Sequence, residues 1–136
     1  MKQAFHTVSV STNGPGLYEI TDKLTEFLND RKDGLVTCFV RHTSASLLIQ
    51  ENADPDVQKD LQSFFAYLAK NGMHYRHTAE GPDDMPSHIR SALTQTSIAI
   101  PVRDGKPALG TWQGLYVFEH RDAPHRREVL LHYLGD

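Results

Sequence analysis

Histidines beside acidic residues are the side chains of this sequence that could do chemistry. The chain has eight histidines in 136 residues, and four of them stand in polar, turn-rich or strand-end segments: His42, His77, His88 and His120. Imidazole binds metal ions and transfers protons near neutral pH. A neighbouring carboxylate orients the ring or works with it as acid and base. If the fold brings these segments together, they form a metal or acid–base site; if it does not, the protein is a small domain with many surface histidines.

The segment between His77 and His88 also carries two adjacent acids, Asp83 and Asp84. The spacing of the two histidines matches no short zinc motif. The glycine and prolines between them favour turns, so the segment can still fold back on itself. The acids could then hold a hard cation, accept protons or orient the imidazoles. The alternative is a solvated acidic turn in which Asp84 caps the following helix.

His42 follows an apolar strand and opens a turn rich in hydroxyl groups, which includes Thr43 and Ser44. Hydroxyls and free backbone N–H groups at the end of a strand can bind an anion. Taken alone, this segment is better interpreted as an ordinary polar turn. A serine nucleophile is not favoured, because the sequence contains no Gly-x-Ser-x-Gly motif.

Two further candidates lie near the C-terminal strands. Trp112 stands between Gly110 and Gly114, and glycines on both sides let a ligand or a neighbouring subunit approach the backbone closely. The indole could stack on an aromatic ring, although a core or interface position fits the pattern at least as well. Glu119 and His120 end the same strand, where successive side chains face opposite sides. If His120 points into a site, Glu119 points away from it unless the strand end redirects it.

Composition limits the class of protein. The chain is 39% hydrophobic and 23% charged, which is typical of a globular protein with a single domain over residues 1–136. A net charge of −3 argues against a general nucleic-acid binder, which usually has a basic face. No apolar run approaches the ~18 residues of a membrane helix, and the N-terminus lacks a signal-peptide core. We therefore expect a cytoplasmic protein with no nucleic-acid or membrane partner, in which the single cysteine, Cys38, is a buried and unreactive thiol.

Periodicity and turn signals predict the elements that position these residues. Alternating or continuous apolar runs predict strands at residues 3–10, 17–20, 35–41, 46–50, 97–102, 111–119 and 129–133. Helices are expected over about 21–30, from 55 to about 70, and over about 86–93. Seven or eight strands with two or three helices define an α+β domain, and the short links between the last strands favour antiparallel pairing. The polar loop at 73–85 is too long for a simple connector, which is typical of functional or mobile segments.

Two helix starts have a specific signal. Thr21 is expected to cap the first helix, and Asp54 followed by Pro55 is expected to start the second. Apolar residues then recur along the second helix at helical spacing, and we expect this stripe to belong to the core: Val57, Leu61, Phe64, Phe65 and Leu68.

Several motifs together resemble one family. They are His-Thr-Ser-Ala-Ser at 42–46, Glu-Asn-Ala-Asp-Pro at 51–55, Glu-Gly-Pro-Asp-Asp-Met-Pro-Ser-His at 80–88, Gly-Thr-Trp-Gln at 110–113 and Glu-His-Arg at 119–121. The chain resembles the YjbQ-like family, also labelled secondary thiamine-phosphate synthases. The resemblance covers nearly the whole chain, and no motif position departs from it.

The resemblance implies a single compact α+β domain, two or three helices packed with mostly antiparallel sheets, that forms a homotrimer about a threefold axis. It also implies a divalent metal, zinc or magnesium, bound by histidines. In this sequence the ligands would be His42, His77 and His88, with His120 as a fourth candidate. The implied activity joins hydroxymethylpyrimidine diphosphate to a thiazole phosphate and releases pyrophosphate, and it is understood to be a secondary activity of the family.

A metal-assisted enzyme with a small phosphorylated substrate gives each candidate a role. Asp83, Asp84 and Glu119 would hold the metal, orient a histidine or move protons. Phosphate would contact Thr43, Ser44 and Arg121, and a heterocycle would lie against Trp112 and Gln113. Two alternatives use the same residues: a hydrolase with a zinc-bound hydroxide, and a non-catalytic trimer that holds a metal or a small ligand.

Overall fold

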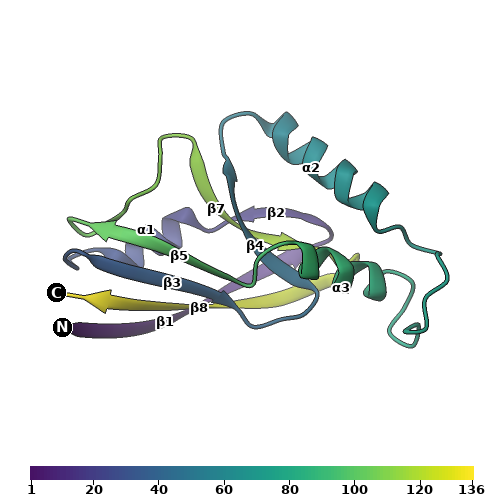
Figure 1. Ribbon diagram of the computed structural model, residues 1–136, viewed down its shortest axis with the longest axis horizontal. Helices are drawn as coiled ribbons and strands as arrows, with labels where there is room; N and C mark the ends of the chain where they lie inside the picture. Colours follow the sequence, from purple (N-terminus) through teal and green to yellow (C-terminus); the bar gives the residue numbers. More distant parts are fainter.

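The computed structural model describes residues 1–136, which form eight strands and three helices (Figure 1). The strands are β1 (Lys2–Asn13), β2 (Gly16–Glu19), β3 (Gly34–Val40), β4 (Ala45–Glu51), β5 (Ser97–Arg103), β6 (Lys106–Pro107), β7 (Gln113–Glu119) and β8 (Pro124–Gly135); the helices are α1 (Thr21–Leu28), α2 (Pro55–Leu68) and α3 (Asp84–Leu93). They build a five-stranded sheet in the order β1-β8-β3-β5-β6 and a three-stranded sheet in the order β2-β7-β4. All strand pairs are antiparallel, so the expected α+β class is confirmed.

The first and last strands are longer than the sequence predicts. They pair along their whole length, from Lys2 opposite Gly135 to Asn13 opposite Pro124 (Figure 1). The added residues at their ends are mostly polar, including the buried Thr12 and Arg127, so apolar alternation does not reveal them, although the hydrogen-bond ladder continues through them. Strand β8 is an inner strand, because it also pairs with β3 on its other side.

The hydrophobic core lies between the two sheets. It is one buried cluster that draws Val36 and Leu131 from the five-stranded sheet and Leu47, Leu115 and Val117 from the three-stranded sheet. Helix α1 closes the cluster with Leu24 and Leu28, both completely buried. Cys38 belongs to the same cluster, and burial raises the pKa of its thiol to about 12, as expected for an unreactive cysteine.

Strand β7 is buried on both of its faces. Leu115 and Val117 face the core, while Tyr116 and Phe118 point the other way and are also buried. On that outer side Gln58 of α2 donates a hydrogen bond to the Tyr116 hydroxyl at 3.2 Å. The Phe65 ring meets Phe118 edge-on, with 5.4 Å between ring centroids. Helix α2 therefore covers the outer face of the three-stranded sheet.

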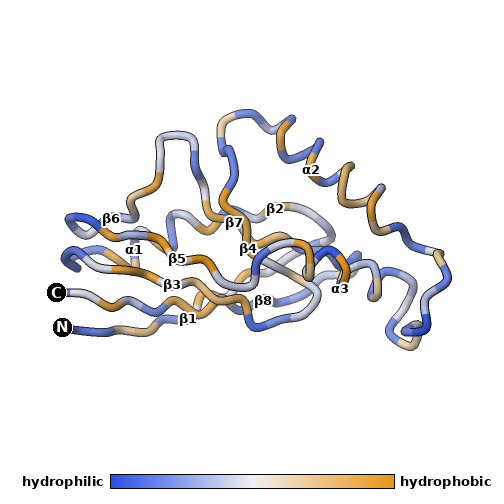
Figure 2. Tube along the Cα trace, in the orientation of Figure 1, coloured by the Kyte–Doolittle hydropathy of each residue, from blue (hydrophilic) through white to orange (hydrophobic).

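The prediction that the whole apolar stripe of α2 belongs to the core is wrong. No residue of this helix is buried, and Phe64 and Leu68 are 57% and 47% exposed. The helix lies at the edge of the molecule (Figure 1), and Figure 2 shows apolar positions recurring along it. The three-stranded sheet is narrow, so α2 meets it mainly through Phe65. The helical spacing of apolar residues predicts that a helix has an apolar face, but it does not predict which elements cover that face.

The two predicted helix starts have different outcomes. Asp54 caps α2 as expected, since its carboxylate accepts the backbone N–H of Asp56 at 2.9 Å. Thr21 is not a cap but the first residue of α1. Its hydroxyl accepts the Leu115 N–H at 2.9 Å and donates to Glu19 at 2.8 Å. The threonine is used to fasten the helix to β7, a contact that local sequence does not show.

The outer face of the five-stranded sheet exposes several apolar side chains among polar ones. On β3, the buried residues Val36 and Cys38 alternate with Leu35 and Phe39, which are 43% and 45% exposed. Leu134 lies opposite Leu35 on the neighbouring strand and is also exposed. None of the three helices combines the length and apolarity needed to cross a membrane.

Candidate metal centre

The polar segment at 77–88 folds back so that two histidines meet one carboxylate. The Nε2 atoms of His77 and His88 lie 2.7 and 3.0 Å from Oδ2 of Asp84. Asp84 is the first residue of α3 and His88 is one turn later, while His77 arrives from the preceding loop. The three ligand atoms lie within 4.8 Å of one another, and no other group of this kind occurs in the protein.

Glycine lets the loop return to the helix. Gly81 has a φ of +104°, a conformation that costs an L-residue with a side chain considerable strain. Its N–H donates to the carbonyl of Thr78 at 3.3 Å, and its own carbonyl accepts the N–H of Asp84 at 3.4 Å. The turn signals of the sequence thus place His77 beside the start of α3.

Arg121 fixes the two acids at the start of α3. Its Nε lies 2.9 Å from Asp83 Oδ2, and its Nη1 lies 2.9 Å from Asp84 Oδ1. Burial opposes ionisation of both acids, but hydrogen bonds and nearby positive charge outweigh it. The pKa of Asp83 is lowered mainly by Arg121, and that of Asp84 by His77, His88 and Arg121. Asp84 is therefore a carboxylate with one oxygen held by Arg121 and the other offered to the histidines.

His88 has a fixed tautomer that presents a lone pair to Asp84. Its Nδ1 lies 2.9 Å from the carbonyl oxygen of Thr43, and because a carbonyl only accepts, Nδ1 carries the hydrogen. In the neutral ring Nε2 is then an acceptor that faces the carboxylate, a second acceptor. Such a contact requires a cation between the two atoms, either a proton or a metal ion. A histidine held by a carbonyl at its other nitrogen is the usual arrangement in metal sites.

The donor set fits a divalent transition metal. Two imidazoles and one carboxylate suit zinc, iron or manganese, whereas magnesium prefers oxygen ligands. A hollow of about 270 Å³ opens beside His77. Its other lining residues are Gly72, Met73, Tyr75, Thr78, Gly81 and Pro82. The cluster thus has room at its open side for water or a small ligand.

The other two candidate histidines lie outside this cluster. Nε2 of His42 accepts the backbone N–H of Glu128 at 2.8 Å, which leaves that atom without a lone pair for a metal. Burial and the charge of Arg127 lower the His42 pKa. His120 is buried and its Nε2 lies 2.9 Å from the Ser46 hydroxyl. Burial lowers the pKa of His120 to about 3, so its ring is neutral.

Glu119 is enclosed on the core side of β7, opposite to His120. It is completely buried and paired with Arg127. Its oxygens also accept hydrogen bonds from the Thr12 hydroxyl and from the backbone N–H groups of His120 and Arg121. Despite burial, these partners, led by Arg127, keep the Glu119 pKa low. None of the hydrogen bonds of this carboxylate reaches His77, Asp84 or His88.

The remaining candidate residues are used locally or stand apart. Ser44 accepts a hydrogen bond from Arg127 at 3.0 Å, and Thr43 contributes its carbonyl to His88. Trp112 is 63% exposed in the turn before β7, and Gln113 accepts the Gly110 N–H at 2.8 Å. The structure does not bring either of these last two side chains to the cluster.

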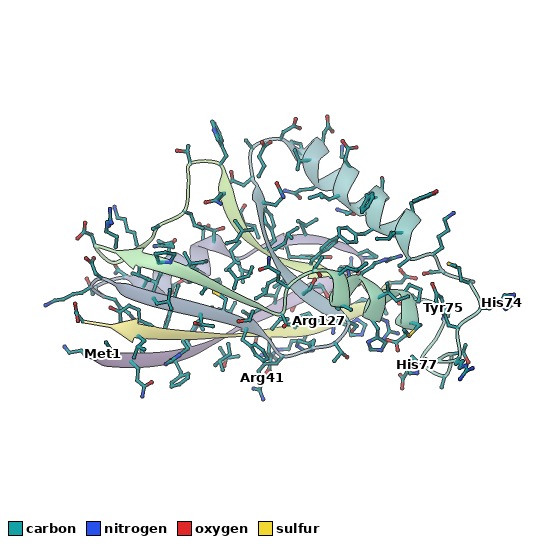
Figure 3. The ribbon with its side chains drawn as sticks, in the orientation of Figure 1. Met1, Arg41, His74, Tyr75, His77 and Arg127 are labelled. Atoms are coloured by element: carbon teal, nitrogen blue, oxygen red, sulfur yellow. The ribbon has the colours of Figure 1, made fainter.

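Sequence reasoning missed the partner of Glu119. Arg127 is interpretable in hindsight, because it shares the alternation of Val129, Leu131 and Tyr133, which all point inward from β8. Figure 3 shows Arg127 in the interior, whereas His77 and Tyr75 lie on the loop at one end of the molecule. The sequence signal for a buried arginine is a charged residue at a position where the alternation of the strand otherwise places apolar side chains.

Two packed antiparallel sheets, with a histidine–carboxylate cluster at one end, define the class as a small α+β domain with a candidate metal centre. A family model described as UPF0047 protein YjbQ-like matches residues 6–136, and the chain belongs to this family. A UPF0047 protein of Synechocystis sp. is 54% identical over 130 residues, which cover 93% of this chain and 88% of that protein. The UPF0047 protein YjbQ of Escherichia coli O157:H7 is 38% identical and covers 96% of each chain.

Solved structures agree with this fold. The crystal structure of a YjbQ/UPF0047 protein from Clostridium acetobutylicum has a TM-score of 0.85 at 31% identity, over 96% of this chain and 99% of that one. A YbjQ-like protein of unknown function from Sulfolobus solfataricus has a TM-score of 0.86 at 18% identity, over 99% and 100%, which supports the fold alone. The resemblance seen in the motifs is confirmed.

Proposed function

We propose that this protein is a divalent-metal-dependent enzyme that acts on a small phosphorylated substrate. The specific activity we propose is that of a thiamine-phosphate synthase, which joins hydroxymethylpyrimidine diphosphate to a thiazole phosphate and releases pyrophosphate. The observation that carries the proposed metal is the convergence of His77 Nε2, His88 Nε2 and an Asp84 carboxylate oxygen, which lie within 4.8 Å of one another. The family resemblance supports the choice of substrates.

The residues around the cluster have distinct tasks in this proposal. A bound divalent ion would neutralise the diphosphate and stabilise the pyrophosphate leaving group. His77, His88 and Asp84 would hold the ion. Arg121 keeps Asp84 ionised and oriented. Asp83 accepts the Asp122 N–H at 2.9 Å and so joins the cluster to the turn between β7 and β8. The hollow beside His77 would admit the substrate.

A zinc hydrolase is a second candidate, favoured by one observation. Two imidazoles with one carboxylate resemble the ligand sets of zinc hydrolases, in which a bound water loses a proton near neutral pH. Diphosphate chemistry more often uses magnesium held by oxygen ligands. The identity of the bound metal therefore separates the two activities.

A homotrimer is also part of the proposal. The open face of the five-stranded sheet exposes Phe5, Leu35, Phe39 and Leu134. Large apolar side chains exposed together on one face are typical of protein interfaces. Burying this face against further copies of the chain would supply the cover that the single domain lacks.

The first test is elemental analysis of the untagged protein. We expect close to one divalent ion per chain in the wild type and none in the His77→Ala/His88→Ala double variant. His74→Ala is the matched control, because His74 lies on the same loop but outside the cluster. Formation of thiamine phosphate is then measured with the retained metal, alongside hydrolysis of a simple phosphate ester. Synthesis that survives in the double variant would contradict the proposal, and metal binding without either turnover would favour the non-catalytic alternative.

A further inference from the structure

A second cavity lies beneath α2, apart from the histidine–carboxylate cluster. It encloses about 500 Å³, which is within the range of small-molecule sites. Its walls include Ser63 and Phe65 of α2, Lys70 just after that helix, and Arg90 of α3, and its floor includes Phe118 and His120. His88 and Arg90 are two residues apart on α3, so they leave the helix about 200° apart. The helix therefore separates this cleft from the candidate metal centre.

Two cations line the cleft without a carboxylate partner. Arg90 is half-buried and forms no ion pair; its Nη2 donates to the Ala69 carbonyl at 2.6 Å, and its Nε has no partner. Lys70 lies over the Tyr67 ring at 4.7 Å and also forms no ion pair. Two carboxylates are on the same lining: Asp122 forms no ion pair with either cation, and Glu119 is paired with Arg127. Because a half-buried charge without an ion pair is costly, Arg90 favours an anion in the cleft, and the exposed Lys70 adds a second positive charge to the lining.

The floor of the cleft offers a neutral acceptor. The Thr94 hydroxyl has one hydrogen and lies 2.9 Å from the Arg90 carbonyl, which can only accept, and 2.6 Å from the Ser46 hydroxyl, which can donate. Ser46 therefore donates to Thr94 and accepts the Nε2–H of His120 at 2.9 Å. The lone pair of this neutral ring is then on Nδ1, which has no hydrogen-bond partner in the protein. His120 is 1% exposed and lines the cleft without adding a charge to it.

The same cleft has an apolar side. Phe65 and Phe118 meet edge-to-face, and such a pair leaves ring faces and edges on which a planar apolar group packs well. The opposing cations and this aromatic pair lie within one cavity. A ligand that satisfies both has an anionic group at one end and a planar body at the other.

We propose that this cleft binds a small organic anion, a carboxylate or a phosphate monoester attached to a planar apolar body. Arg90 and Lys70 bind the anionic group, and Phe65 and Phe118 contact the body. The site does not depend on the proposed enzyme activity, because it uses none of the three candidate metal ligands.

The test is a titration of the full chain, followed by NMR, in buffer with a metal chelator. The probes are phenyl phosphate and benzoate, with inorganic phosphate as the head group alone and benzyl alcohol as the uncharged body. We expect the two aromatic anions to shift the ring signals of Phe118 and His120 and to bind at least tenfold more tightly than benzyl alcohol. The preference between phenyl phosphate and benzoate identifies the head group.

Variants locate the site. Arg90→Gln and Lys70→Gln should each weaken binding, by about tenfold and several-fold. Lys59→Gln should not, because Lys59 lies on the exposed side of α2 beside Asp56. The His77→Ala/His88→Ala variant should bind as the wild type does. Lys70 is exposed, so its substitution decides the question even if Arg90→Gln fails to fold. Absence of binding, equal binding of benzyl alcohol, or affinities unchanged in both cleft variants would overturn the proposal.

Discussion

Glu119 and Arg127 form a pair of opposite charges in the core, because the alternation of side chains along β7 and β8 points both of them inward. Both side chains are almost completely buried, Thr12 donates a further hydrogen bond to Glu119, and Arg127 donates one to Ser44. A buried pair of this kind contributes little net stability over an apolar pair, but removing one partner leaves the other charged and desolvated. The pair therefore fixes how β1, β7 and β8 meet.

Replacing Glu119 by Gln should be strongly destabilising. The change leaves the Arg127 guanidinium buried without its counter-ion, and we expect the free energy of unfolding to fall by about 3–5 kcal/mol. Urea denaturation measures the change. Glu128→Gln is the control: it removes an exposed pair with Arg41, at 3.7 Å, which is worth at most about 1 kcal/mol. Equal small losses in the two variants would contradict the assigned role of Glu119.

His120 should make the stability of the protein depend on pH. Burial holds its folded pKa at about 3, far below the ordinary 6.5, so the unfolded state binds a proton between these values and the folded state does not. Stability contributed by the neutral ring is therefore complete above pH 6.5 and is lost as pH falls, with a slope of at most about 1.4 kcal/mol per pH unit.

His120→Gln tests this linkage, since an amide can donate a hydrogen bond to Ser46 without carrying a charge. The unfolding free energy of the variant, measured by denaturant at several pH values from 6.5 to 4.5, should decline less steeply than that of the wild type. His74→Gln, in the exposed loop, should leave the slope unchanged. Parallel curves for all three proteins would show that His120 titrates normally.

Among the elements, helix α2 was predicted correctly at its start and incorrectly in its burial. Its start at Asp54-Pro55 was predictable because a capping carboxylate and a first-turn proline act locally. How much of its apolar face is buried was not predictable, because that depends on a sheet assembled from three separate segments, β2, β4 and β7. The result is a helix held mainly by Phe65 and by the hydrogen bond from Gln58.

Helix α2 should open more readily than the sheets. Few buried contacts hold it, so its amides should exchange with solvent well before those of β3 and β8, as measured by hydrogen exchange with mass spectrometry. Asp54→Ala removes the cap, which is worth about 1 kcal/mol, and should speed exchange in α2 roughly fivefold. The exchange of β3 serves as the internal control. Protection of α2 equal to that of β8 would mean that something further covers the helix.

The candidate metal centre likewise has a part that local sequence predicts and a part that it does not. Turn residues and the four-residue spacing of Asp84 and His88 are local, so the sequence could bring that part together. The Arg121 clamp and the carbonyl of Thr43 come from elsewhere in the chain, 37 and 45 residues away from the residues they hold. Whether His42 and His120 join the cluster depends on how strand ends are stacked, and residue types alone do not contain that information.

For the molecule as a whole, the uncovered sheet face predicts an assembly. We expect a solution mass of three times 15.3 kDa, measured by light scattering after size-exclusion chromatography. Phe39→Asp places a charge in the middle of that face and should give single chains, because an unpaired charge in an apolar interface is costly. Lys59→Glu, on the exposed side of α2, should leave the mass unchanged. A wild-type mass of one chain would contradict the trimer.

The position of β8 between β1 and β3 has a consequence for synthesis of the protein. Both neighbours of this strand, β1 and β3, are made long before it. Until residues 124–135 leave the ribosome, the two earlier strands have unpaired backbone edges facing each other across an empty position. The five-stranded sheet can therefore form only after translation is nearly finished. A chain that stalls before this strand would expose two edges, a form prone to aggregation and to capture by chaperones.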